Sequence, residues 1–307
     1  MSQLSRVQPW IQAARPAAYP MIFLPLLIGQ VFALQTTSSL STSYFWYAAL
    51  FGALFQILLL YLNDYSDEAV DQLATHYWLS GGSRVLPEGK LRRSNLLTGA
   101  KLVILAMLGL ALWLAVLHDR PWMFAGTAAA FFCCWAYNLP PLQFSYRGHG
   151  EVLQGLGCGV MLPLIGFYLQ LGSLQAFPWL NLIPLYLLFH AGNIITALPD
   201  HAADLQSDKQ TYPVRHGEFR ARVVALLLLA VACLAIATTG RQLPVTSIAL
   251  ILLPSGIILI GIVLTGTLKR ADSQAFASCK QFVTWAMICQ AWLLCAWIGV
   301  LLVEALR

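Results

Sequence analysis

The stretch YAALFGALFQILLLYL (residues 47–62) is followed directly by NDYSDEAVD (residues 63–71). The first stretch is apolar apart from Gln56 and belongs to an apolar run at about 43–62 that is long enough to span a membrane as a helix. The second stretch places four acidic side chains within nine positions. A membrane span that ends in such a cluster predicts a membrane protein with its functional groups at the membrane surface.

The composition of the whole chain supports a polytopic membrane protein. Of its 307 residues, 59% are hydrophobic and 10% are charged, whereas soluble domains carry about 25% charged residues. The apolar runs are continuous, which favours helices over the alternating strands of a barrel. We therefore expect an all-α fold with nine transmembrane helices, at about 17–34, 43–62, 98–117, 122–138, 151–171, 178–198, 223–239, 246–267 and 281–303.

The basic residues predict the orientation of the chain. With the N-terminus in the cytoplasm, nine spans place 15 of the 18 basic residues on the cytoplasmic side, Lys269 and Arg270 among them. We expect an integral, multi-pass protein, of the inner membrane if bacterial, with its N-terminus and active-site loops in the cytoplasm. The net charge of +5 reflects this asymmetry, so no nucleic-acid partner is expected and no obligate protein partner is inferred. Four arginines are interpreted as solvated determinants of orientation: Arg92, Arg93, Arg220 and Arg222.

Acidic residues gather on the same side, in two loops at about 63–97 and 199–222. The first loop has Asn63, Asp67 and Asp71 at four-residue spacing, and the second has Asp200, Asp204 and Asp208 at the same spacing. On a helix, each triplet would stay within about 80° of one face. Like charges at this spacing repel unless a cation neutralises them. Two such stripes, with Asp64 added to the first, predict a site for a hard divalent cation such as Mg²⁺.

The two acidic stretches have further features in common. Gln56 lies seven residues before Asn63, and Asn193 lies seven residues before Asp200. We therefore expect one domain, 1–307, with two related halves (about 1–150 and 151–307) around a central cavity that cytoplasmic loops cap. Basic residues that could clamp a diphosphate follow each stripe, namely Arg84, Lys209 and Arg215. Gly81 and Gly82 would permit a close approach of the backbone beside Arg84.

NDYSDEAVD together with PDHAADLQSDK (residues 199–209) resembles the paired signatures of the UbiA superfamily of intramembrane aromatic prenyltransferases. Three further stretches are similar to the MenA-type branch, which prenylates 1,4-dihydroxy-2-naphthoate. These are WIQAARPAAYPMIFLPLLIG (10–29), SGGSRVLPEG (80–89) and YNLPPLQFSYRGHGE (137–151). His149 replaces an apolar residue that is usual in the last of them.

The resemblance implies Mg²⁺-dependent prenyl transfer from an isoprenyl diphosphate to an aromatic acceptor. It implies two Mg²⁺ ions bridging the diphosphate, held by Asn63, Asp67, Asp71, Asp200 and Asp204, with Asp64 and Asp208 in support. Arg84, Arg147, Lys209 and Arg215 would neutralise further charge, and Tyr137 would stabilise an allylic cation through its ring face. Asn138 and His149 would orient the acceptor, with Gln56 and Asn193 as deeper substrate-binding residues.

Several alternatives stay open on the sequence. We favour 1,4-dihydroxy-2-naphthoate as the acceptor, in biosynthesis of a menaquinone or phylloquinone type. The change at His149 leaves 4-hydroxybenzoate, homogentisate, a tetrapyrrole or a lipid as other acceptors. A transporter would also have many spans, but its charged groups usually lie near the bilayer midplane, away from the membrane surface. A membrane scaffold would not need two matched acidic triplets.

Overall fold

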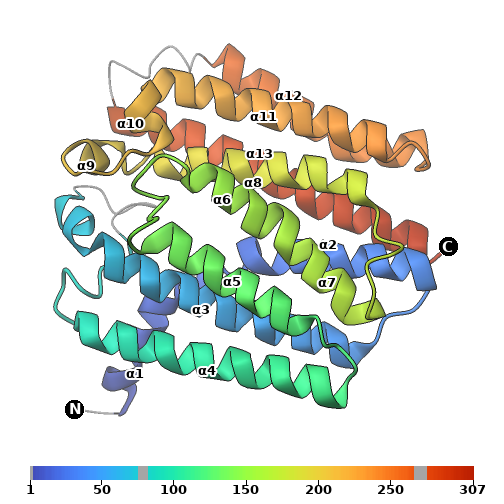
Figure 1. The fold of residues 1–307 in the computed structure, drawn as a ribbon. Coiled ribbons are helices and arrows are strands. Elements are labelled where there is room, and N and C mark those ends of the chain that lie inside the picture. The colour runs from blue at the N-terminus through green and yellow to red at the C-terminus, as the bar shows by residue number, and fades with distance from the viewer. Residues whose placement is uncertain (1–2, 75–81, 266–274) are drawn as a thin grey trace.

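The computed structural model describes residues 3–74, 82–265 and 275–307, and these form an all-helical bundle (Figure 1). Gly81, Lys269 and Arg270 lie outside the described residues. The long helices are α2 (Pro20–Thr37), α3 (Thr42–Leu73), α4 (Arg93–Leu117), α5 (Met123–Asn138), α8 (Leu182–Ala197), α11 (Glu218–Thr239), α12 (Val245–Leu264) and α13 (Ala275–Ala305). A further long rod combines α6 (Gly150–Leu156), the π-helical η2 (Gly157–Met161) and α7 (Leu162–Leu171). The short elements are α1 (Gln3–Ala14), η1 (Pro16–Ala18), η3 (Trp179–Asn181), α9 (His201–Leu205) and α10 (Tyr212–His216).

Eight helical segments in the described part of the chain are long and apolar enough to cross a membrane. The protein is thus an integral, multi-pass membrane protein. The expected span at 122–138 is present as α5, but its 16 residues make a helix of about 24 Å, shorter than a hydrocarbon core of about 30 Å. The count of nine spans therefore stays a prediction, as does the cytoplasmic orientation. The bundle has α1, α9 and α10 at one end, whereas α13 finishes at the other (Figure 1).

Glycines allow two helices of the bundle to pack with their backbones in contact. A Cβ atom on Gly29 of α2 would lie 2.0 Å from the carbonyl oxygen of Pro163, and one on Gly166 of α7 would lie 2.1 Å from that of Leu26. Small residues serve this purpose in membrane bundles, because lipid supplies no hydrophobic force to hold helices together. This contact fixes α2 against the rod that begins with α6.

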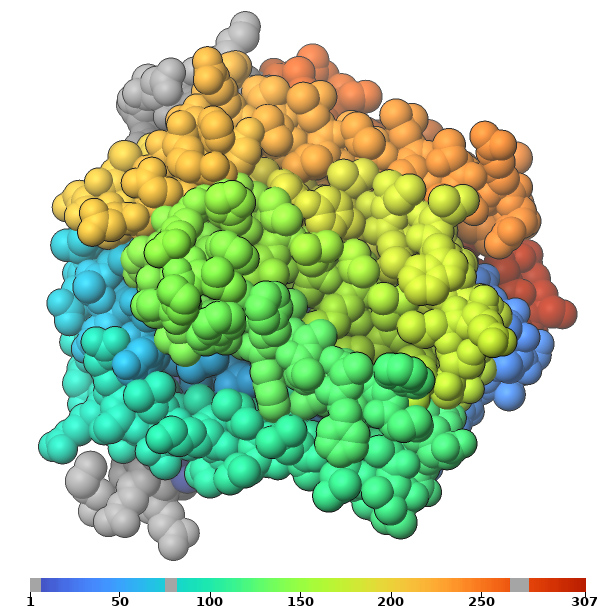
Figure 2. All heavy atoms as spheres, viewed as in Figure 1, coloured from blue at the N-terminus to red at the C-terminus, as the bar shows by residue number. Residues whose placement is uncertain are grey.

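The first acidic stretch is helical, as the spacing predicted. Helix α3 continues past its apolar part without a break and carries Asn63, Asp67 and Asp71 on its last turns. On the surface, this end of α3 lies directly against the 199–217 segment (Figure 2). The fold therefore brings the two acidic stretches together, although they lie far apart in the sequence.

The prediction of a second helical stripe is wrong. Helix α8 ends at Ala197 and α9 covers only His201–Leu205, so Asp200 is its N-cap and Asp208 lies in the following turn. Pro199 explains the break, because proline has no backbone N–H to continue α8. The two acidic stretches are therefore not built alike, and the wider relation between the two halves stays a prediction.

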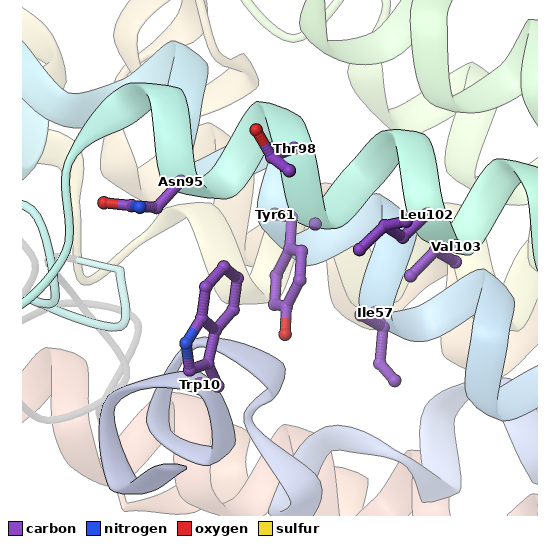
Figure 3. Close-up of a pocket in the computed structure, with 8 residues that line it drawn as sticks. Trp10, Ile57, Tyr61, Asn95, Thr98, Leu102 and Val103 are labelled. Atoms are coloured by element: carbon purple, nitrogen blue, oxygen red, sulfur yellow. The ribbon is translucent and has the colours of Figure 1, made fainter. Parts of the chain in front are cut away.

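Helix α1 packs across the outside of α3 and α4, beside a cavity of about 420 Å³ (Figure 3). The rings of Trp10 and Tyr61 lie side by side here, with centroids 5.6 Å apart. Gly99 leaves room for both rings, since a Cβ atom there would lie 2.8 Å from each of them. Polar contacts hold the end of α1, as Gln12 donates a 2.6 Å hydrogen bond to the carbonyl of Ser83. This packing sets the position of Arg15, which follows α1.

We predict that Gly166→Ala will destabilise the bundle by about 1–3 kcal/mol, because the added methyl group must displace the backbone of α2. The measurement is the apparent melting temperature in detergent. Gly109→Ala is the matched control, since nothing lies within 4 Å of a Cβ atom there. Equal melting temperatures for the two variants would contradict the role of Gly166.

Candidate active site

The first acidic motif is a buried hydrogen-bonded cluster on α3. Asn63 donates a 2.8 Å hydrogen bond from Nδ2 to Oδ2 of Asp67, and Ser66 donates from Oγ to Oδ1 of the same carboxylate at 3.1 Å. The side chains of Asp64, Asp67 and Asp71 are all buried. Carboxylates buried this closely need a cationic partner, because burial penalises each charge and the charges repel one another.

Lys209 supplies a cation that joins the two motifs. Its Nζ lies 2.9 Å from Oδ2 of Asp67 and 3.9 Å from Oδ1 of Asp204. The ammonium also lies 5.4 Å from the ring centroid of Tyr146. Burial alone would lower the pKa of Lys209, but the carboxylates of Asp67 and Asp204 raise it well above its ordinary value. The lysine is therefore a fixed positive charge between α3 and the second acidic stretch.

Asp204 is the most deeply buried acid of the second motif, with 1% of its surface exposed. Thr211 donates a 3.0 Å hydrogen bond to its Oδ2, whereas its buried Oδ1 accepts none within the described part of the chain. The pKa of Asp204 is raised to about 7, mainly by burial; Asp200 and Asp67 add to the rise, and Lys209 and Thr211 oppose it. An additional cation near Oδ1 would favour the ionised carboxylate.

Asp64 and Asp71 contact the loop that follows α3, and Asp64 also contacts Arg15 after α1. Asp64 forms an ion pair with Arg15 and accepts a hydrogen bond from the Ser83 hydroxyl, so its carboxylate is already neutralised. Arg84 donates to the backbone carbonyl of Asp71. Gly82 has a φ of +64°, and a Cβ atom there would lie 2.0 Å from Oδ2 of Asp71. Only glycine permits this approach, as expected for Gly82 from the sequence.

The acidic residues fit a hard cation by their chemistry. Within residues 3–74, 82–265 and 275–307, no three acidic, histidine or cysteine side chains lie close enough together to hold a metal ion. The oxygens of Asp67 and Asp204 nevertheless converge from two elements on one positive charge, and the buried Oδ1 of Asp204 has no hydrogen-bond donor in those ranges. Carboxylate and amide oxygens are the ligands that Mg²⁺ prefers. The site therefore suits a divalent cation that shares these carboxylates with Lys209 or displaces it.

Tyr137 lies deeper in the bundle, within a polar network. Nδ2 of Asn193 is 3.1 Å from the Tyr137 hydroxyl and 2.8 Å from Oε1 of Gln154, and it donates to both. Asn193 thus joins α5, α6 and α8 at one level of the bundle. Gln56 is buried in α3, and its Nε2 makes no hydrogen bond within the described residues.

Arg215 is paired with Glu151 through a hydrogen bond of 2.7 Å from Nη2 to Oε1. Gly148 has a φ of +76°, and a Cβ atom there would lie 2.4 Å from Nε of Arg215. The guanidinium therefore packs on the 144–150 loop beside Glu151. Glu151 itself is buried at the start of α6.

Four predicted residues lie apart from these contacts. Asp208 and Arg147 are exposed on their loops. His149 is also exposed, with its Nδ1 2.9 Å from the carbonyl oxygen of Arg147. Asn138 is buried, but its Nδ2 donates to the Cys134 carbonyl of its own helix. Their proposed roles in binding stay predictions.

A chain of polar contacts, here called the relay, supports the second motif, and it shows that the interpretation of Arg222 as solvated is wrong. Nδ1 of His201, next to Asp200, lies 2.9 Å from Oε1 of Glu218, and Arg222 donates to Oε2 of that carboxylate at 3.1 Å. Arg222 is fully buried and also donates to the Ser278 hydroxyl at 2.9 Å. The relay ties α9 to α11 and α13. The Glu218/Arg222 spacing of four residues was a signal in the sequence that could have indicated this pair.

Comparison with known proteins identifies the family of this chain. The profile of the UbiA prenyltransferase family matches residues 22–294. The chain belongs to this family. It is therefore a prenyltransferase, and the transporter and scaffold alternatives are wrong.

Two relatives are named 1,4-dihydroxy-2-naphthoate octaprenyltransferase. The protein of Escherichia coli (strain K12) is 25% identical over 244 residues, 76% of this chain and 77% of that protein. The protein of Mycobacterium tuberculosis (strain ATCC 25618 / H37Rv) is 27% identical over 231 residues, 73% and 75% of the two chains. A UbiA homologue from Archaeoglobus fulgidus, solved with GPP and Mg²⁺, has the same fold. Its TM-score is 0.67 at 18% identity, covering 95% of this chain and 99% of that one.

We predict that Glu218→Ala will destabilise the protein by about 3 kcal/mol, because removing one partner of a buried ion pair leaves the other charge unpaired. The apparent melting temperature in detergent should fall accordingly. Glu88→Ala is the control, since the 2.7 Å pair of Glu88 with Lys90 is exposed. An unchanged melting temperature for Glu218→Ala would show that the relay does not stabilise the fold.

Proposed function

We propose that this protein transfers a prenyl group from an isoprenyl diphosphate to 1,4-dihydroxy-2-naphthoate in a Mg²⁺-dependent reaction of quinone biosynthesis. The observation that carries the proposal is the convergence of Asp67 and Asp204 on one positive charge, at 2.9 and 3.9 Å. Two acidic motifs at the end of an apolar bundle suit a substrate with a charged head and a lipid-soluble tail.

The comparisons support each half of this proposal. The names of the two relatives favour the naphthoate acceptor. The Archaeoglobus homologue was solved with GPP and Mg²⁺, which favours an isoprenyl diphosphate held with that metal. Prenylation of 4-hydroxybenzoate, homogentisate, a tetrapyrrole or a lipid is the alternative, and an acceptor assay distinguishes them.

Asp67, Asp71, Asp200 and Asp204 would hold the metal together with Asn63, with two ions as the preferred number. When bound, Mg²⁺ would neutralise negative charge that develops on the leaving diphosphate. Asp64 is a weaker candidate as a ligand, since Arg15 and Ser83 already engage it. Asp208 is exposed and would contribute only if the turn after α9 moved.

The remaining residues would bind the organic substrates. Lys209 and Arg84 provide charge for the diphosphate oxygens, and such charge-assisted hydrogen bonds are strong in a buried site. The ring of Tyr137 would stabilise positive charge at the first carbon of the prenyl chain. Asn193 holds the Tyr137 hydroxyl at 3.1 Å. The apolar bundle would take up the prenyl tail and exclude water from the reacting carbon.

We predict that Asp67→Asn and Asp204→Asn will each lower turnover about 100-fold or more, as loss of a preorganised charge at a reacting centre does. The measurement is Mg²⁺-dependent product formation by purified protein in lipid. Asp119→Asn is the matched control, because Asp119 lies outside both acidic motifs and asparagine tolerates its φ of 52°. Wild-type turnover in both motif variants, with the protein folded, would remove these two residues from the metal site.

The acceptor is tested with a radiolabelled isoprenyl diphosphate and 1,4-dihydroxy-2-naphthoate, 4-hydroxybenzoate and homogentisate in parallel reactions. We expect a labelled lipid product from the naphthoate, and none when EDTA removes Mg²⁺. A product from another acceptor alone would correct the acceptor. A product that forms equally well in EDTA would refute the dependence on a metal.

A further inference from the structure

Glu151 is a buried carboxylate that belongs to neither acidic motif. It lies in the first turn of α6, and 5% of its surface is exposed. Arg215 donates a 2.7 Å hydrogen bond to Oε1, and no side chain within the described ranges donates to Oε2. The second oxygen of this carboxylate is therefore available to accept a proton.

The polar network around Tyr137 reaches α6, the helix that carries Glu151. A Cβ atom on the neighbouring Gly150 would lie 3.3 Å from the Tyr137 ring and 3.7 Å from Oδ1 of Asn193. Gln154, one turn further along α6, accepts the 2.8 Å hydrogen bond from Asn193. The Glu151 carboxylate lies close enough to Tyr137 to interact with it electrostatically, and the Gln154 amide belongs to the same network. The ring of Tyr137 is where we place the prenyl cation.

Two carboxylates of the first acidic motif already accept hydrogen bonds or ion pairs from several neighbours. Asp67 receives hydrogen bonds from Asn63, Ser66 and Lys209. Asp64 is engaged by Arg15 and Ser83. Glu151 is separate from these contacts, since its ion pair is with Arg215. An aromatic ring becomes a stronger carbon nucleophile when its hydroxyl group loses a proton, so a carboxylate here would activate the acceptor.

We propose that Glu151 is the general base that activates a hydroxyl group of the aromatic acceptor; this proposal rests on the proposed function. The bond between the first prenyl carbon and the diphosphate oxygen breaks, and its electron pair stays with the diphosphate. A ring carbon forms the new bond to that prenyl carbon while the hydroxyl proton passes to Glu151. The resulting dienone loses the hydrogen at the alkylated carbon as a proton to the diphosphate. The oxygen then takes its proton back from Glu151.

The test separates acceptor activation from binding of the isoprenyl diphosphate. Full-length Glu151→Gln is assayed with 1,4-dihydroxy-2-naphthoate and geranyl diphosphate. Binding of a non-reacting thio analogue of geranyl diphosphate is measured with Mg²⁺. We expect the kcat to fall about 100-fold or more, as loss of a general base does, with unchanged analogue binding. Glu304→Gln is the matched control, because Glu304 also pairs with an arginine, Arg307, at 3.1 Å.

A second variant distinguishes a base from a structural residue. In Glu151→Ala, added formate should restore turnover in proportion to its concentration, because a small carboxylate can occupy the space and accept the proton. Wild-type kcat in Glu151→Gln, absence of rescue by formate, or loss of analogue binding in step with turnover would each overturn the proposal. If the wild-type protein binds the analogue but forms no product with any acceptor, the proposed function fails and the role of Glu151 fails with it.

Discussion

The ion pair between Lys209 and the carboxylates of Asp67 and Asp204 is the contact on which the described site depends. At 2.9 and 3.9 Å it joins α3 to the segment after α8, and it does so in a buried place. Buried like charges would otherwise force these elements apart or drive the carboxylates to take up protons. Burial is the main cause that raises the pKa of Asp204 to about 7, and Lys209 opposes this rise. A divalent cation near the same carboxylate would act in the same direction as Lys209.

The same need for charge balance explains the surroundings of the motifs. Arg15 reaches Asp64 because α1 is anchored on the 82–91 loop through Gln12. Gly82 lets that loop approach Asp71 closely. On the other side, Glu218 and the fully buried Arg222 hold His201 next to Asp200. Each acidic motif is therefore held by its own set of neighbouring side chains, and Lys209 connects the two motifs.

The sequence predicted the parts of this arrangement that depend on local periodicity. Apolar runs located the long helices, and four-residue spacing placed Asn63, Asp67 and Asp71 on one helical face of α3. The same reasoning failed at Asp208, because Pro199 interrupts the helix before the second motif. Contacts between distant residues have no local signal. Arg15 pairs with Asp64 across 49 positions and Arg215 with Glu151 across 64, so sequence reasoning missed Arg15, Ser83 and Glu151 as members of the site.

We propose different electrostatic tasks for the two ends of the site. At the diphosphate end, Lys209 and a metal ion would share the positive charge around the carboxylates. At the proposed acceptor end, Glu151 is buried and Arg215 donates one hydrogen bond of 2.7 Å to it. Tyr137 lies between these ends, with Asn193 on its hydroxyl and Gly150 against its ring. If Arg215 instead served the diphosphate, the buried Glu151 would lose the side chain that donates to it, and breaking such a buried pair costs several kcal/mol. The observed pairing therefore favours a role for Arg215 beside Glu151, and it leaves Lys209 and Arg84 as the residues that we propose for the diphosphate.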